Sequence, residues 1–492
     1  RTAATSFELF GKIMSEAISR RGISGLSGYL PMLRLDRASA AKALRFLGLG
    51  GRNAGYRSTA GWDEDALTLA AEAARNVLGN TKPDRVCFAS TSAPFFERGH
   101  APLLVDALAL PSQTRTIDVA GSRRCAVSAL LDALLGSGDS LIAAGEKRPV
   151  QAGSSFQFAW GDGGSAVRVS DEGGAHLVGH ASSAHDFVDV YSSREHPSPY
   201  GYEERFVKET ATRDIIAPTI KAALTDAGIA AEDIDHACVI EPLPGMWRAI
   251  GKACGITAPN HASDLSAAAG DLGAAHPLFS LALALDAAKP GDKILLAGFG
   301  SGCDVLIFEM SGPVAGTEQA RQALSHGLIF SDYVRFISLT GALDLDWGVR
   351  SEFEQKAQAT VLHRNGRDTL GFIGGRDAKG NVQFPKSRIP VRPDANGPEQ
   401  MEDVRLVDVP AKLVSVTADR LNFTPAPPFW FGLVQFENGA RVMMEFTDAD
   451  EKGFSVGDEV TMRLRIKSHD KSHGFRTYFW KAGPLRRPAM EA

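Results

Sequence analysis

Two neighbouring segments best predict the fold: GDLGAAHP at residues 270–277 and PGDKILLAGFGSG at residues 290–302. A Gly/Ala-rich turn leads into an apolar segment, residues 277–288, which we expect to be a helix. The run 294–298 then predicts a buried strand that ends in the loop Gly300-Ser301-Gly302. Glycine has no Cβ, so both clusters allow a backbone or a ligand to approach closely.

Outward from this stretch, residues 23–311 alternate between short apolar strands and amphipathic helices. Expected strands cover residues 23–33, 85–90, 116–119, 140–144, 236–241 and 305–310. Expected helices cover residues 62–78, 101–108, 124–135, 210–227 and 247–254. This alternation is typical of an α/β fold with parallel strands covered by helices.

The order and spacing of the two glycine-rich segments resemble the C-terminal half of the thiolase superfamily. Within it, 3-hydroxy-3-methylglutaryl-CoA (HMG-CoA) synthases and ketoacyl synthase III enzymes are the most similar. Residues 161–166, Gly-Asp-Gly-Gly-Ser-Ala, likewise resemble a Gly-Asp-Gly-Ala-Ala-Ala segment near the middle of such folds. The resemblance implies a duplicated five-layer αβαβα fold, with halves at 23–170 and 171–311.

The composition changes after Ser311. Residues 312–361 predict a helical connector, and residues 401–492 contain short strands between turns, at 411–416, 431–436, 440–446 and 459–466. Such spacing is typical of a small β-barrel. It resembles the OB-fold domain that accompanies many thiolase-like proteins.

In that family a four-cysteine zinc ribbon precedes the barrel. Here residues 362–400 keep its outline, with Gly374–Pro385 as the frame, but no cysteine follows Cys303. A thiolate zinc site needs four such ligands. We therefore predict a degenerate ribbon without metal.

Composition excludes several classes of function. Net charge is −5 and 44% of residues are hydrophobic, which favours neither nucleic acid nor an anionic membrane. No apolar run approaches the roughly 18 residues that a membrane span needs. The five scattered cysteines predict reduced thiols and a cytoplasmic protein. Residues 1–22 predict an amphipathic N-terminal extension rather than a targeting peptide.

Enzymes of this superfamily place a reactive Cys at a helix N-terminus, where its pKa falls. The matching segment here is Gly-Ser-Arg-Arg-Cys-Ala-Val-Ser-Ala-Leu, residues 121–130. Aligning Ser128-Ala129-Leu130 with the family's Ala-Ala-Leu puts Arg123 at the nucleophile position. The alternative register puts Cys125 there, although a free Cys is more often a small buried residue.

The other family positions also differ. Glu241 falls near the catalytic His, Asp271 replaces the catalytic Asn, and Thr91 replaces a Glu of the HMG-CoA type. One hypothesis is that Arg123 pairs with Glu241 and Asp271 in a cluster that fills the acyl pocket, because a buried guanidinium needs such partners. The alternative is that Arg123 points to solvent and Asp271 caps the next helix.

We place Gly300, Ser301, Gly302 and His276 at the acyl-CoA pocket. For His276 the alternative is a polar packing role. For the glycine loop it is a close helix contact.

The resemblance implies that the chain is a subunit of a thiolase-type complex that processes acyl-CoA. The complex as a whole would be an acyltransferase, and its active Cys would lie on a partner thiolase. Alternatively, the chain is itself an acyltransferase or lyase that uses Cys125 or the pair Asp271 and Glu241, or it is a non-catalytic scaffold. No cofactor is expected beyond the coenzyme A thioester as substrate. We expect a dimer, with itself or with a thiolase, in which residues 116–119 lie near the interface.

Overall fold

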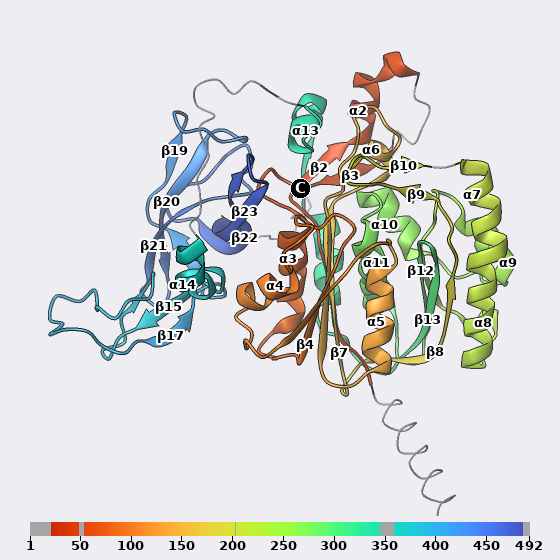
Figure 1. Cartoon of the computed structure of the whole chain (residues 1–492), viewed down its shortest axis with the longest axis horizontal. Helices are drawn as coiled ribbons and strands as arrows, with labels where there is room; N and C mark the ends of the chain where they lie inside the picture. Colours follow the sequence, from red (N-terminus) through yellow and green to blue (C-terminus); the bar gives the residue numbers. More distant parts are fainter. Residues whose placement is uncertain (1–20, 49–53, 202, 344, 346–358, 486–492) are drawn as a thin grey trace, which may run out of the picture. The chain divides into compact units, whose positions relative to one another are not determined.

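The chain forms two units in a computed structural model, which describes residues 21–48, 54–201, 203–343, 345 and 359–485 (Figure 1). The first unit takes its described residues from Arg1–Ala60, Asp65–Ala101 and Thr114–Ala342. The second takes them from Gly61–Glu64, Pro102–Gln113 and Leu343–Ala492. Most of the expected extension 1–22 lies outside the described residues.

The first unit is built on a nine-stranded mixed sheet with the order β11-β12-β13-β8-β1-β7-β6-β4-β5. In chain order these strands are β1 (Gly22–Tyr29), β4 (Arg85–Ala89), β5 (Arg115–Val119), β6 (Ser140–Glu146), β7 (Gly163–Ser170), β8 (Ala175–Ala184), β11 (His236–Val239), β12 (Lys293–Phe299) and β13 (Gly302–Met310).

The prediction of parallel strands is correct only toward the two edges of this sheet. Strand β4 runs parallel to β5 and β6, and β11 runs parallel to β12. The central pairs are antiparallel, including β12 with β13. The reason at β12 and β13 is their short connection through Gly300 and Ser301, both with positive φ. A connection this short joins antiparallel neighbours, whereas parallel neighbours need a long crossover.

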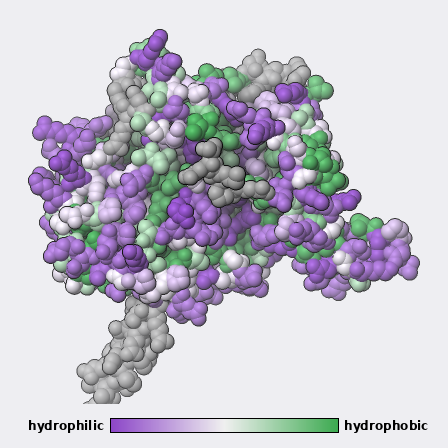
Figure 2. Space-filling model, turned by 180° about the vertical axis from the view of Figure 1, so that it is seen from behind, coloured by the Kyte–Doolittle hydropathy of each residue, from purple (hydrophilic) through white to green (hydrophobic). Residues whose placement is uncertain are grey.

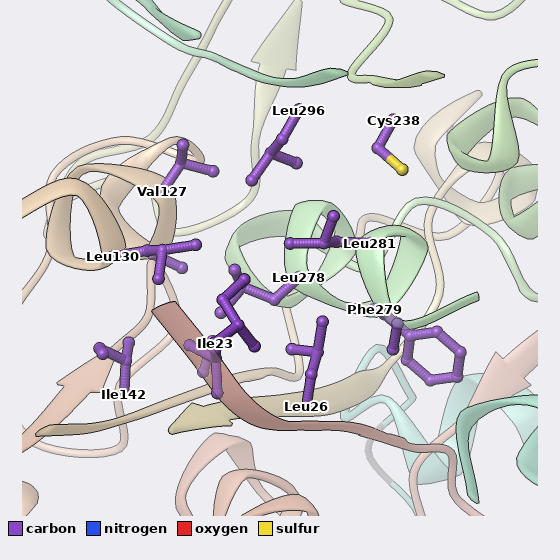
Figure 3. Packing of buried hydrophobic residues seen from close by; sticks show 14 of the residues in the cluster. Ile23, Leu26, Val127, Leu130, Ile142, Cys238, Leu278, Phe279, Leu281 and Leu296 are labelled. Carbon is purple, nitrogen blue, oxygen red and sulfur yellow. The ribbon is translucent and has the colours of Figure 1, made fainter. Parts of the chain in front are cut away.

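Helices α5 (Cys125–Leu135) and α11 (His276–Ala287) form the middle layer of the unit. Figure 3 shows Val127 and Leu130 of α5 and Leu278 of α11 between Ile142 of β6 and Leu296 of β12, all in one buried cluster. Strands of both halves of the sheet therefore cover these two helices.

Two further helix layers cover the outer faces. Helix α3 (Ala66–Leu78) packs on β1, β6 and β7. Helices α8 (Ala217–Ala227) and α9 (Trp247–Cys254) form a second buried cluster with the opposite face of β12 and β13. Together with the middle layer, this gives the αβαβα layering that the resemblance implied, with strands of mixed instead of parallel direction (Figure 1).

The helix predicted for residues 210–227 begins earlier and has an irregular centre. Helix α7 (Glu204–Thr210) continues through a wider π-type turn, Ala211–Ile216, into α8. Pro218 stands in the first turn of α8 and has no N–H to donate. The regular hydrogen-bond pattern is therefore interrupted next to it.

The remaining elements of the first unit are short. They are β2 (Leu33–Asp36), α2 (Arg37–Ala43), β3 (Tyr56–Thr59), α6 (Phe156–Ala159), β9 (Val190–Tyr191), β10 (Tyr200–Gly201), α10 (His261–Ala269), α12 (Thr317–Ser325), β14 (Leu328–Phe330) and α13 (Tyr333–Leu339). Strand β14 pairs with β2, so part of the expected helical connector forms a strand of the first unit. Residues 344 and 346–358 of that connector lie outside the described residues.

The second unit contains most of α4 (Ala101–Ala107), helix α14 (Ala359–Leu370) and two sheets. The larger sheet has the order β19-β20-β18-β22-β23, with β21 paired to β20. Its strands are β18 (Ala411–Leu413), β19 (Thr417–Asp419), β20 (Phe429–Phe436), β21 (Arg441–Glu445), β22 (Glu459–Asp470) and β23 (Phe475–Pro484). In the described part of the chain, an isolated bridge joins Phe446, which follows β21, to Ala482 of β23. The sheet is not a closed barrel, and the OB fold stays a proposal.

The predicted ribbon segment forms the smaller sheet, from β15 (Ile373–Arg376), β16 (Val382–Gln383) and β17 (Glu402–Arg405). Its loops are joined by Arg392, which donates to Asp377 Oδ2 at 2.8 Å and pairs with Glu399. The Asp377 carboxylate also accepts the N–H groups of Lys379 and Asn381. Among the described residues, no group of three or more His, Cys, Asp or Glu side chains could hold a metal ion.

The face of the molecule in Figure 2 is covered mainly by hydrophilic residues, with hydrophobic residues in small patches. Isolated exposed apolar side chains are normal on a protein surface. Within the described ranges, every helix is too short or too polar to cross a membrane.

Candidate functional site

The turn before α5 is held by the glycine loop that follows β12. The Ser122 hydroxyl donates to the Gly300 carbonyl at 2.7 Å, and the Cys125 N–H donates to the Ser122 carbonyl. A Cβ on Gly300 would lie 2.3 Å from Ser122 Oγ, and one on Gly302 would lie 2.2 Å from the Ser183 carbonyl oxygen. Gly300-Ser301-Gly302 therefore makes the close contact that was the alternative to a ligand-binding role.

Arg123 is buried in this turn, and the alternative in which it points to solvent is wrong. Only 9% of the residue is exposed. Its guanidinium donates to Asp271 Oδ2 at 3.3 Å and forms a second ion pair with Asp189. Burial alone would lower the pKa of Arg123, but the carboxylates of Asp189 and Asp271 more than offset this, so the pKa is raised. The side chain is a fixed cation.

Asp271 both pairs with arginines and caps a turn, so it combines the two roles predicted as alternatives. It lies 3.5 Å from the Arg148 guanidinium and accepts the Gly273 N–H at 2.8 Å. Burial acts to raise the pKa of Asp271, but Arg148 and Arg123 outweigh it and hold the pKa well below its usual range. Asp271 is therefore an ionised structural partner and a poor proton acceptor.

Glu241 is not part of the cluster, and the prediction that it pairs with Arg123 is wrong. Its carboxylate accepts the Trp247 N–H at 3.1 Å and the Ser263 hydroxyl. It therefore links the start of α9 to α10. Asp189, just before β9, forms the ion pair with Arg123 that was expected of Glu241.

Cys125 is the first residue of α5, but its environment suppresses the thiolate. The residue is 3% exposed, and burial, followed by the nearby Glu146 and Cys87, raises the pKa of the thiol far above its ordinary value. At a helix N-terminus the dipole should lower this pKa. Desolvation outweighs the dipole, so Cys125 is a neutral thiol near pH 7.

Thr91 and Ser92 bind a carboxyl group that the sequence patterns did not single out. Glu146, the last residue of β6, accepts the Thr91 N–H at 2.7 Å and the Thr91 hydroxyl at 2.9 Å through Oε1. Its Oε2 accepts the Ser92 hydroxyl at 2.5 Å. The available signal was an acidic residue at the end of an apolar strand, in Gly-Glu-Lys-Arg at 145–148.

His276, the first residue of α11, is buried, and both of its ring nitrogens contact the backbone. Nδ1 accepts the Leu272 N–H at 3.1 Å, and Nε2 lies 2.9 Å from the Ala262 carbonyl oxygen, to which it donates. Burial lowers the pKa of His276. The geometry corresponds to the packing role that was the alternative for this residue.

Comparison with solved structures identifies the architecture. The chain is similar to a crystal structure of HMG-CoA synthase complexed with CoA, with a TM-score of 0.58, 17% identity, and coverage of 69% of this chain and 95% of that one. It is also similar to 3-oxoacyl-(acyl carrier protein) synthase III from Pseudomonas aeruginosa PAO1, with a TM-score of 0.52, 19% identity, and coverage of 60% and 99%. The first unit has a thiolase-type fold.

Comparison of sequences points the same way. The family profile described as "3-Oxoacyl-[acyl-carrier-protein (ACP)] synthase III C terminal" matches residues 224–307. Hydroxymethylglutaryl-CoA synthase of Thermococcus onnurineus is 29% identical over 295 residues, which cover 57% of this chain and 83% of that protein. The thiolase-type unit thus resembles acyl-CoA condensing enzymes in sequence as well as in fold.

Proposed function

We propose that the thiolase-type unit binds an acyl-CoA without becoming acylated, and that the chain is a subunit of a complex that forms or breaks carbon–carbon bonds on acyl-CoA. The reactive cysteine of this complex is then on a partner thiolase. The observation that carries the proposal is the buried ion pairing of Arg123 in the turn before α5.

The first step of the argument concerns the nucleophile. A guanidinium is always protonated and offers no lone pair to a thioester. The only thiol in the turn, Cys125, is buried and its pKa is raised. Covalent catalysis of the thiolase kind needs an activated thiolate. This site therefore lacks the acyl-enzyme step.

The second step concerns the ligand. The similar protein from Thermococcus onnurineus is a hydroxymethylglutaryl-CoA synthase, and a structural neighbour was crystallised with CoA. These likenesses support an acyl-CoA thioester as the ligand, and we propose no other cofactor. All five cysteines are free and buried, which supports the cytoplasm as the compartment.

The third step concerns the partner. Strand β5 lies at one edge of the nine-stranded sheet, and Ile117 at its centre is 51% exposed. An exposed edge strand is a ready surface for pairing with another chain. We place the contact with a second copy or with a thiolase on this strand.

A second candidate function is supported by Glu146. A buried carboxyl group could allow the chain itself to act on an acyl-CoA by acid–base chemistry, as a lyase without an acyl-enzyme. The pair first expected for this, Asp271 and Glu241, is less suitable. Asp271 is held ionised by arginines, and Glu241 is bonded to Ser263 and Trp247.

The test is to purify the full chain alone and in a mixture with a candidate partner thiolase. Calorimetry with CoA and acetyl-CoA measures binding, and release of free CoA measures turnover. The proposal predicts binding by the lone chain and turnover only in the mixture. Turnover by the lone chain supports the second candidate. Failure of both preparations to bind CoA or acetyl-CoA would refute both and leave a non-catalytic scaffold.

A further inference from the structure

Glu146 lies where three segments of the thiolase-type unit meet. It ends β6, which runs parallel to β4, so the loop after β4 with Thr91 and Ser92 lies at the same edge of the sheet. The third segment is the turn before α11, whose Ala274 N–H donates to Glu146 Oε1 at 3.2 Å. The carboxyl ends of parallel strands are the usual place for ligands in α/β sheets.

The environment of the Glu146 carboxyl differs from that of Asp189 and Asp271, the two acids that pair with Arg123. Glu146 is 0% exposed and receives four hydrogen bonds, from two N–H groups and two hydroxyls. Asp189 and Asp271 each have an ion pair, whereas Glu146 has none within the described ranges. Thr91, which donates to this carboxyl, is an exposed residue. A buried carboxyl without an ion pair, bonded to the hydroxyl of a residue at the surface, is suited to proton transfer.

Arg148 supplies unused donors beside Glu146. Its Nη2 is bonded to the Asp271 carbonyl, and its guanidinium stacks 3.6 Å from the centre of the Trp160 ring. Nε and Nη1 are buried and have no hydrogen-bond partner in the part of the chain that the structure describes. A Cβ on Gly273 would lie 3.1 Å from both Arg148 Nε and the Glu146 carboxyl carbon. The two side chains therefore flank the glycine backbone of one turn.

We propose that Glu146 removes and returns the Cα proton of an acyl-CoA bound at this site, and that Arg148 stabilises the enolate oxygen. In this step the Cα–H bond breaks, the proton moves to the Glu146 carboxylate, and the electron pair moves to the thioester carbonyl oxygen. No oxidant, reductant or thiolate is needed. The carboxyl comes from the end of β6 and not from position 91, where the family resemblance would place it. The inference rests on the proposed function in requiring acyl-CoA binding.

The electrostatics agree with this geometry. Burial raises the pKa of Glu146, and the opposing effects of Arg148 and of the hydroxyl and N–H donors do not cancel it. Cys125, a neutral thiol, also lies near Glu146, and Arg148 is shared with Asp271. Because the base is the ionised form, proton abstraction should increase as the pH rises through this raised pKa.

The test is exchange of the Cα hydrogens of acetyl-CoA and octanoyl-CoA in D2O, followed by mass spectrometry, with the full chain. Wild type should incorporate deuterium. E146Q should exchange at least about 100-fold more slowly, E146D should recover part of the rate, and R148M should also be slow. The matched control is E72Q, which removes another buried carboxyl of the same unit, paired with Arg75 on α3.

Calorimetry with the same thioesters separates the two proposals. Acyl-CoA binding that is unchanged in E146Q, together with lost exchange, supports the role of Glu146. Binding with equal exchange in wild type and E146Q, or with no exchange in wild type, would overturn that role and leave acyl-CoA binding intact. Absence of binding in wild type would overturn the proposed function itself.

Discussion

Replacing Arg123 by methionine tests whether the cluster is a coupled set of charges. Methionine keeps much of the side-chain volume but removes the cation that pairs with Asp189 and Asp271. Asp271 retains Arg148, so the loss falls mainly on Asp189, whose side chain is 7% exposed. Removing one partner of a buried pair costs about 3–5 kcal/mol. We expect R123M to lower the free energy of unfolding of the first unit by this amount at pH 7.

A double-mutant cycle isolates the pair. D189N alone leaves Arg123 bonded to Asp271, and we expect it to cost about 1–2 kcal/mol. In R123M/D189N no unpaired carboxylate remains at position 189, so the double variant should be more stable than R123M. The coupling between the two changes should be about 2 kcal/mol.

The assay is hydrogen exchange of peptides from the first unit, followed by mass spectrometry across a urea series. It reports unfolding of the thiolase-type unit separately from that of the second unit. If the effects of the two changes add to within about 0.5 kcal/mol, or if R123M costs less than about 1 kcal/mol, the charges are independent. The argument for a coupled cluster would then be wrong.

Three further predictions concern the cysteines, the ribbon segment and the sheet edge. Iodoacetamide at pH 8 should modify none of the five cysteines of the native chain and all five after unfolding in urea, because each is buried and has a raised pKa; a native adduct on Cys125 would contradict this. R392A should lower the urea midpoint of peptides from 373–405, whereas a chelator should leave it unchanged, since Arg392 joins Asp377 to Glu399; one tightly held zinc ion per chain would refute this. Wild type should sediment as a dimer at micromolar concentration and I117E as a monomer, if Ile117 lies in the contact; a monomeric wild type would rule out self-association through β5.

Local patterns predicted most of the first unit. Helix α9 has the predicted limits, Trp247 and Cys254, because its apolar residues follow a helical period and Gly255 ends it in a left-handed conformation. The strand directions were less predictable. Alternation of strands and helices favours parallel pairing, but the tight connection through Ser301 reverses β13 relative to β12.

The candidate site was predictable only where a motif marked it. Arg123 and Asp271 each stand at a recognisable position, and the structure pairs them. Asp189 and Glu146 are single acidic residues outside any motif. Only the packing of distant segments brings Asp189 to the turn before α5 and Glu146 to the turn before α11. Glu241 stands close to the expected position in sequence, yet its carboxylate bonds to α9 and α10. Such contacts depend on the length and direction of each side chain within the fold. The spacing of residues along the sequence does not predict these two properties.

The central claim is that this thiolase-type unit binds acyl-CoA but forms no acyl-enzyme. The most direct measurement is the intact mass of the full chain after incubation with acetyl-CoA and octanoyl-CoA, under conditions in which calorimetry shows binding. We predict an unchanged mass, because Arg123 cannot attack a thioester and the Cys125 thiol is buried with a raised pKa. An added acyl group that maps to Cys125 would contradict the claim and would identify Cys125 as the nucleophile.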